Sequence, residues 1–511
     1  MNRKKNTARG TAFGLVVRVI RTVFPFFIRA IFIRTLGADY LGVNSLFRSV
    51  LDVLNMAELG VSSAIMYSMY RPIAEHDTEK ICSLMNLFRR YYYVIGLVIL
   101  GIGLLLIPFL PSLIRDPVPD DINLTVIYLM YLGTNVLSYW LFSYRNILFI
   151  AHQRFDIASI VKAIVITGQY SLQIVVLLVF KNYYLFLALY LLSQITINLG
   201  TAAVSGKFYP DYRPRGEVSG VEKKEINGKV VDLFTLKIAD AVNNSSNQVI
   251  VSAFLGLSTL VVFSNYGTVI GGIMSIFSVF FSSTIGGVGN YLVTRGKDDN
   301  KQLFYNINHV VMLALAVCCS CFICVCRPFM SLWMGSEFTM GMDYTILFAL
   351  YLFSQEAQLA LLLFKDAGGM WKKDKVRTLV ITGMNLGLSI ILSQVIGLYG
   401  VLISTVFSLL VIGLPWLARN VEEGLLSIDI HRFILKTAVY VLVTVLCCTV
   451  SYMASCQVVP GHAVTEILVK LLIAAAISSS LFVLCFWRSG ENVYLLKQLR
   501  RAVTKKVINR F

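Results

Sequence analysis

The first long apolar stretch of the chain, residues 12–33, reads AFGLVVRVIRTVFPFFIRAIFI and has arginines inside it. It meets the ~20 residues that a helix needs to cross a bilayer. At 100° per residue, Arg18, Thr22, Pro25 and Arg29 fall on one face of that helix. A guanidinium near mid-bilayer is costly unless it faces water or a partner. The stretch therefore predicts a membrane span with a cationic stripe that lines a polar pathway for an anionic cargo. The alternative is that Arg18 and Arg29 reach the two membrane interfaces.

The composition indicates a membrane protein throughout. Of 511 residues, 57% are hydrophobic and 14% are charged, and the mean hydropathy is +0.72, whereas a soluble domain is about 25% charged. The net charge of +17 is explained by basic cytoplasmic loops that face anionic lipid, and we expect no nucleic-acid partner. The ten cysteines cluster within apolar runs and are interpreted as packing residues. We expect neither a metal site nor a cofactor.

Apolar runs of span length recur along the whole chain, and we expect an all-α polytopic protein with about fourteen transmembrane helices. The predicted spans are roughly 12–33, 46–70, 84–110, 122–150, 157–180, 183–204, 232–254, 258–290, 304–327, 342–365, 376–396, 400–419, 434–455 and 463–487. Lys and Arg gather in alternate connections and in both tails. By the positive-inside rule, both termini are therefore cytoplasmic.

The two halves of the chain resemble each other. The tetrapeptide VITG occurs at 165–168 and at 380–383, each time after a basic loop, and the turn at 36–41 matches residues 255–260 in its place. Such a repeat predicts two pseudo-symmetric lobes of about six helices around a central cavity, plus two C-terminal helices. The predicted divisions are an N-lobe at 1–204, a cytoplasmic loop at 205–231, a C-lobe at 232–419, two helices at 420–487 and a basic cytoplasmic tail at 488–511.

The segment RTLGADYLGVNSLF, residues 34–47, resembles the amino-terminal signature of polysaccharide flippases, and ELGVSSA, residues 58–64, resembles the small-residue patch that follows in those proteins. They belong to the multidrug/oligosaccharidyl-lipid/polysaccharide exporter superfamily. The resemblance implies a transporter of the bacterial cytoplasmic membrane rather than an enzyme. It implies alternating-access export of an undecaprenyl-diphosphate-linked oligosaccharide for cell-surface polysaccharide synthesis. It does not identify the sugar.

The same resemblance makes membrane lipids and the lipid-linked oligosaccharide the expected partners, with a glycan polymerase or glycosyltransferases as candidate protein partners. We expect a monomer. The alternative is a cation-coupled drug or metabolite antiporter of the same superfamily, which would favour an acidic, apolar pocket. A membrane glycosyltransferase or sugar polymerase is a further class, but the chain has no large catalytic loop and we expect no catalytic residue.

Candidate substrate-binding residues in the first half are polar side chains inside the predicted spans. Besides Arg18 and Arg29, they are Arg48, Lys162, Gln169 and Gln173. Arginine binds phosphate oxygens through its planar fork, and we expect Arg48 to lie near Arg29. Arg48 and Asp52 at i and i+4 are equally consistent with an ion pair that only stabilises the helix. The position of Lys162 is equally consistent with a residue at the inner membrane interface.

In the second half, the run at 232–254 has a polar stripe of Lys237, Asn244, Asn247 and Gln248, which are further candidate substrate residues. Amides that bond between helices are the structural alternative. The acidic residues predicted deepest in the membrane are Glu58, Asp240 and Glu356, and ionisable groups there mark ion pathways. We therefore expect these three to couple transport to protons or sodium.

Overall fold

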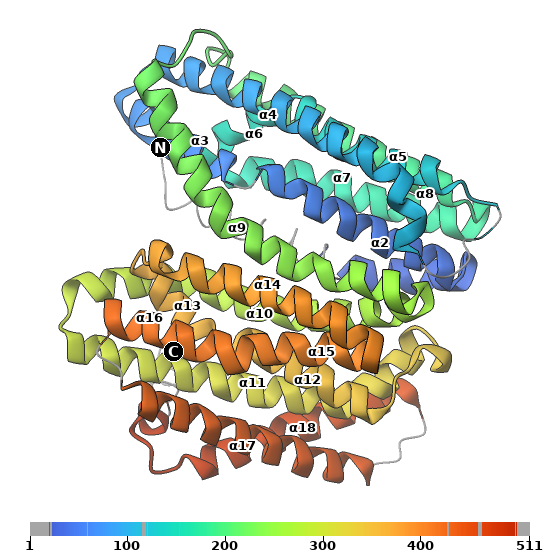
Figure 1. Ribbon diagram of the computed structural model, residues 1–511, viewed down its shortest axis with the longest axis vertical. Helices are drawn as coiled ribbons and strands as arrows, with labels where there is room; N and C mark the ends of the chain where they lie inside the picture. The colour runs from blue at the N-terminus through green and yellow to red at the C-terminus, as the bar shows by residue number, and fades with distance from the viewer. Residues whose placement is uncertain are drawn as a thin grey trace, which may run out of the picture. The chain divides into compact units, whose positions relative to one another are not determined.

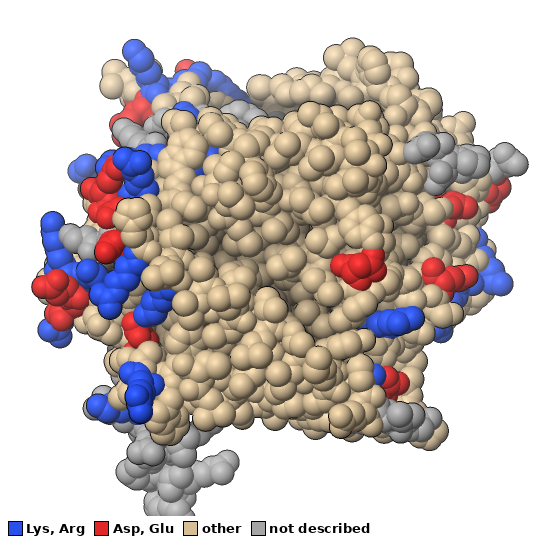
Figure 2. All heavy atoms as spheres, turned by 60° about the horizontal axis from the view of Figure 1, so that its bottom comes forward, with Lys and Arg blue, Asp and Glu red and all other residues tan. Residues whose placement is uncertain are grey.

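The computed structural model describes residues 20, 23–58, 60–114, 119, 121–152, 154–426, 429–457, 462–495 and 497, and every structural statement below concerns these residues. They form helices joined by short turns (Figure 1). Ten of the helices are long and apolar enough to cross a membrane, and a bent pair makes an eleventh. The chain is therefore an all-α, multi-pass membrane protein. Figure 2 agrees, since Lys, Arg, Asp and Glu gather mainly toward two ends of the face in view, with a broad band of other residues between them.

The chain divides into two compact units, Met1–Ser264 and Asn265–Phe511. Unit 1 begins with a helix at 23–35. It continues with α2 (Ala38–Leu54), η1 (Asn55–Glu58), α3 (Val61–Glu75), α4 (Thr78–Leu106), η2 (Ile107–Leu113), α5 (Leu124–Trp140), η3 (Ser143–Arg145), α6 (Asn146–Ala151), α7 (Phe155–Val175), η4 (Val176–Phe180), α8 (Tyr183–Phe208) and α9 (Gly220–Leu255). The helix α10 (Leu257–Thr294) begins in unit 1 and ends in unit 2.

Unit 2 is built around α11 (Lys297–Trp333), which packs along α17 (Ile430–Cys456) and α18 (Ala463–Cys485). Between them in sequence lie η5 (Ser336–Phe338), α12 (Met342–Glu356), α13 (Leu359–Ala367), α14 (Trp371–Ile396), α15 (Leu398–Val406), η6 (Phe407–Gly413) and α16 (Leu414–Gly424). The buried His309 of α11 is hydrogen-bonded through Nδ1 to the Tyr440 hydroxyl at 2.9 Å, which ties α11 to α17.

Local signals explain where several helices begin. The side chain of Asp77 accepts a hydrogen bond from the Lys80 amide, and Asn123 and Asn182 cap α5 and α8 in the same way. Such caps satisfy amides that have no partner inside the helix. Gly37 and Gly256, paired by the sequence repeat, adopt nearly the same conformation, with φ/ψ of 107°/174° and 94°/168°. A positive φ favours glycine, so both copies start the next helix with the same turn.

Two predicted spans are not single straight helices. The span predicted at 46–70 is interrupted, because α2 ends at Leu54, a 3₁₀ turn follows, and Gly60 has a φ of 98°. The span predicted at 122–150 bends by 47° between α5 and the segment Ser143–Ala151. Apolar length alone does not reveal such breaks, since the sequence remains hydrophobic across them.

The connection predicted at 205–231 is shorter than expected, because α8 extends to Phe208 and α9 already begins at Gly220. The segment between them lies against α4. Asn86 donates a hydrogen bond to the Gly216 carbonyl at 2.8 Å, and Arg90 forms an ion pair with Glu217 at 2.9 Å. α9 itself packs on α2 and α3. The predicted lobe boundaries stay predictions.

The end of α6 is attached to the same connection through aromatic rings. The imidazole of His152 lies 4.6 Å from the ring of Tyr209 and 5.6 Å from that of Tyr212, and its Nδ1 is 2.9 Å from the Leu148 carbonyl. Burial lowers the pKa of His152, although the hydrogen bond to Leu148 opposes this shift. The neutral imidazole is therefore the form that fits this contact.

Candidate substrate site

Unit 1 contains a polar cavity of about 330 Å³ between the helix at 23–35, α2, α5, α7 and α8. Among the described residues that line it, only Arg29 and Arg48 are charged, so we call it the arginine chamber. Its lining consists of Pro25, Ile28, Arg29, Phe32, Leu41, Asn44, Arg48, Tyr131, Ile166, Gln169, Tyr170, Gln173, Phe186, Leu187, Tyr190 and Gln194. The structure thus brings Arg29, Arg48, Gln169 and Gln173 to one place.

Arg29 is oriented by two serines. Its Nη1 donates to Ser264 at 3.1 Å and its Nη2 to Ser45 at 3.4 Å, and the two hydroxyls are 3.3 Å apart. Serines are small enough to let helices approach, and they bond across helix interfaces. The guanidinium is therefore held at the wall of the chamber.

Arg48 lies on α2 and is exposed to the cavity. Within the described part of the chain it donates no hydrogen bond. Its charge and that of Arg29 repel each other. Two like charges that face one cavity raise the electrostatic energy of the chamber, and a bound anion would lower it.

The amides of α7 form a short chain at the chamber wall. Gln169 donates to Gln173 at 3.2 Å, and Gln173 donates to the Phe186 carbonyl at 3.1 Å. Both side chains are buried. Their bonds link α7 to α8, so they stabilise the wall as well as supplying polar groups to it.

A second cavity of about 250 Å³ adjoins the first and shares Arg48, Tyr131, Tyr190 and Gln194 with it. We call it the amide chamber. Its lining consists of Arg48, Leu51, Asp52, Asn55, Tyr131, Thr134, Asn135, Ser138, Tyr139, Tyr190 and Gln194. Sequence reasoning missed most of these residues. The signal was present, because Tyr131, Asn135 and Ser138 recur at helical spacing on α5 and Tyr190 and Gln194 are one turn apart on α8.

The other predicted substrate residues do not line these chambers in the described structure. Lys162 lies on α7, partly exposed, and is absent from both linings. Gln248 accepts a hydrogen bond from Ser49 at 2.5 Å, which joins α9 to α2, and Asn247 is buried beside it. This part of the polar stripe thus contacts protein. Arg18 lies outside the described residues, as do the side chains of Lys237, Asp240 and Asn244.

Of the acidic residues predicted to couple ions, Glu58 belongs to unit 1 and Glu356 to unit 2. The carboxylate of Glu58 accepts a hydrogen bond from the Tyr92 hydroxyl at 2.9 Å and another from Ser62, next to the break between α2 and α3. Glu356 is buried at the end of α12 in unit 2. Glu58 follows closely in sequence on Asn55, which lines the amide chamber. Asn55 accepts a hydrogen bond from the Tyr139 hydroxyl at 2.9 Å.

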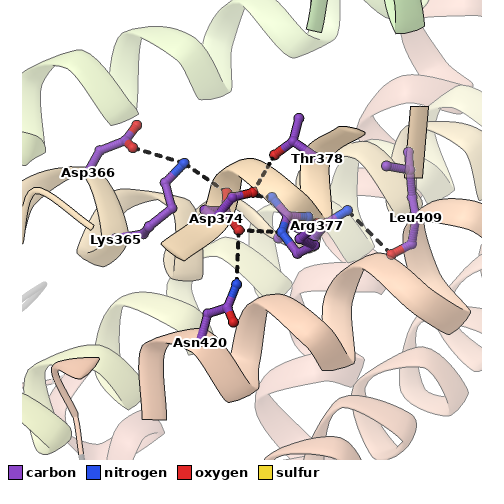
Figure 3. A network of polar contacts seen from close by, with 8 residues as sticks. Lys365, Asp366, Asp374, Arg377, Thr378, Leu409 and Asn420 are labelled. Atoms are coloured by element: carbon purple, nitrogen blue, oxygen red, sulfur yellow. Dashed lines mark hydrogen bonds and ion pairs between the residues drawn. The ribbon is translucent and has the colours of Figure 1, made fainter. Parts of the chain in front are cut away.

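Unit 2 contains a buried ionic network around Asp374 that the sequence analysis did not predict (Figure 3). Asp374 accepts two hydrogen bonds from Arg377, one of them at 2.8 Å, one from Lys365 at 3.2 Å and one from Asn420 at 3.3 Å. The side chains of Asp374 and Arg377 are only 2% and 6% exposed. The network joins α13, α14 and α16. Because its charges are paired within the protein, we interpret it as a structural cluster.

No family model matches the sequence, and a comparison with curated proteins finds no match either. Solved structures do match. One is an inward-facing multidrug resistance MATE family transporter of the MOP superfamily, at 14% identity over 81% of this chain and 98% of that one, with a TM-score of 0.63. Another is the lipid II flippase MurJ in an inward closed conformation, at 14% identity over 93% and 99%, with a TM-score of 0.60.

A third is a MOP superfamily transporter from Pyrococcus furiosus, at 14% identity over 83% and 97% with a TM-score of 0.51, described as having a binding pocket of reverse polarity that suggests a different function. At this identity the similarity concerns the fold. The chain has the fold of MOP superfamily transporters over most of its length.

Proposed function

We propose that this chain is a flippase that carries an undecaprenyl-diphosphate-linked oligosaccharide from the inner to the outer leaflet of the bacterial cytoplasmic membrane by alternating access. The observation that carries the proposal is the arginine chamber, in which Arg29 and Arg48 face one cavity within an apolar helical unit. Charged residues within membrane-spanning segments face a cavity or a partner and mark substrate pathways.

The chemistry of the chamber favours a phosphate group. Guanidinium binds phosphate oxygens bidentately and stays charged at all physiological pH values. A diphosphate cannot cross hydrocarbon unaided, so its carrier must offer a hydrated cationic compartment. The fold similarity to a lipid II flippase supports a lipid-linked substrate, and the flippase-like segment at 34–47 supports a glycan cargo.

A drug or metabolite antiporter is the second candidate. It is supported by the fold similarity to MATE transporters and by the carboxylate of Asp52 in the amide chamber. Against it, the larger chamber has two arginines and, among its described lining residues, no carboxylate. A cationic drug would be repelled there, whereas an anion is attracted.

The test is complementation of a flippase-deficient strain, with the protein level measured in parallel. Arg29→Ala and Arg48→Ala should each abolish surface glycan at a normal protein level, and Arg48→Lys should restore it only in part, because lysine offers a point charge. Arg71→Ala is the matched control, since Arg71 lies on the surface in an exposed ion pair with Glu75. Full glycan export by the double variant Arg29→Ala, Arg48→Ala would refute the proposal.

A further inference from the structure

We propose that the amide chamber is a carbohydrate subsite, which receives the sugar nearest the diphosphate while Arg29 and Arg48 hold the phosphates. This inference rests on the proposed function and specifies it. The two chambers share Arg48, Tyr131, Tyr190 and Gln194, so a ligand that occupies one reaches directly into the other. A sugar joined to a diphosphate has this connectivity.

The two chambers differ in charge. In the arginine chamber, the described lining has two cations and no anion. In the amide chamber, the charge of Arg48 is balanced by that of Asp52 one helical turn away, and the rest of the polar lining is neutral. A neutral site rich in donors and acceptors suits a hydroxylated ring, whereas the cationic site suits its phosphate.

Several polar side chains of the amide chamber are accessible from the cavity. Asp52 and Arg48 are exposed to the cavity, and Tyr190 and Gln194 are partly exposed. Within the described part of the chain, none of these four side chains makes a hydrogen bond. Together they offer a carboxylate acceptor, guanidinium and amide donors, and a hydroxyl that does both. This is the mixture that a sugar's hydroxyl groups require.

The wall behind these groups is ordered by hydrogen bonds. The Tyr139 hydroxyl donates to Asn55 at 2.9 Å, and the Tyr131 hydroxyl donates to Asn44 at 2.8 Å. The rings of Tyr131 and Tyr190 lie 6.4 Å apart. Tyrosine has an apolar face and a polar tip, so these rings can cover the C–H face of a pyranose while the polar groups bind its edge. The cavity of about 250 Å³ has the volume of about eight waters at ~30 Å³ each.

The inference is tested by measuring the binding of two kinds of probe to the purified full chain in detergent. One is undecaprenyl diphosphate, and the other is the same lipid with a single glucose, galactose or N-acetylglucosamine. The wild type should bind at least one sugar-bearing probe about tenfold more tightly than the bare lipid. Asp52→Leu and Asn55→Leu should each abolish this difference in affinity between the sugar-bearing probe and the bare lipid.

The control is Asp39→Leu, the same substitution at an exposed position of α2 outside both linings, which should keep both affinities. Equal wild-type affinity for every probe, or an equal loss for both kinds of probe in Asp52→Leu, would overturn the subsite. Saturable ethidium binding that Asp52→Leu abolishes would overturn it in favour of a cation site. If the proposed function itself is wrong, the wild type should bind neither kind of lipid diphosphate, a result that differs from the outcomes above. The subsite would then be refuted as well.

Discussion

Replacing Asp374 by leucine removes the common partner of two cations in the interior of unit 2. In the wild type, Asp374 accepts from Arg377, Lys365 and Asn420, and its own side chain is 2% exposed. After the substitution, Arg377 stays buried on α14 with its positive charge uncompensated. Its neighbour Gln358, whose Oε1 is 3.4 Å from Nη1, is neutral and cannot replace the carboxylate.

The expected cost follows from the burial of the pair. Removing one partner of a buried ion pair costs about 3–5 kcal/mol, because the remaining ion is left desolvated without compensation. The side chains of Asp374, Arg377 and Lys365 are 2%, 6% and 12% exposed, so solvent screens little of their electrostatic interaction. A unit of this size shifts its melting temperature by ~2–4 °C per kcal/mol. Asp374→Leu should therefore lower the melting temperature by roughly 6–20 °C.

The assay is heating of the purified protein in detergent, followed by size-exclusion chromatography of what remains monodisperse. The double variant Asp374→Leu, Arg377→Met removes both charges and should recover most of the loss, since apolar replacement of a buried pair is often neutral. Glu75→Leu is the control, because it breaks an exposed ion pair with Arg71. It should change the melting temperature little, since exposed ion pairs contribute little to stability. A single variant that melts like the wild type, or a double variant as unstable as the single one, would contradict the reasoning.

Three further predictions concern orientation, coupling and pH. A cysteine that replaces the exposed Arg213, between α8 and α9, is introduced into a cysteine-free background. It should react with a membrane-impermeant maleimide only in broken cells. Labelling in intact cells would show that the topology is the reverse of the predicted one. Glu58→Gln should uncouple transport in vesicles from an imposed pH or sodium gradient, because the amide that would then stand beside Tyr92 and Ser62 carries no charge and exchanges no proton. If the flux through the wild type responds to neither gradient, coupling is excluded. Because burial lowers the pKa of His152, its neutral form stabilises the fold above the unfolded pKa of ~6.5, and this contribution is lost as pH falls toward the lower folded value. His152→Gln should therefore reduce the loss of thermal stability that begins as the pH falls below about 6.5, and an unchanged slope would show that another group titrates.

The likeness between the two halves is an example of a prediction that the local geometry supports. Gly37 and Gly256 were paired only by their place in the repeat, and each adopts a positive φ immediately before a helix. A turn of this kind is set by a few adjacent residues, and glycine is favoured there because it has no side chain to clash. Sequence can therefore identify it without knowledge of the packing around it.

The sequence identified only part of the candidate site. Arg29 and Arg48 are conspicuous because a charge in an apolar run is rare. Tyr131, Tyr190 and Gln194 are ordinary residues of membrane helices, and only the packing of α5 against α2 and α8 turns them toward the same cavity. Conversely, Lys162 looked equivalent to the arginines in sequence, yet it lies outside both linings.

The sequence by itself determined the class of the protein, since long apolar runs allow only helices that satisfy their own backbone in lipid. It also determined helix starts such as those after Asp77, Asn123 and Asn182, because a cap needs only residues within one turn. The tertiary structure decided which polar groups meet. Asp374 lies in the predicted connection between the spans at 342–365 and 376–396, yet it is buried and paired with Arg377. Burial and pairing depend on residues far apart in the chain, and no local pattern encodes which helix faces which.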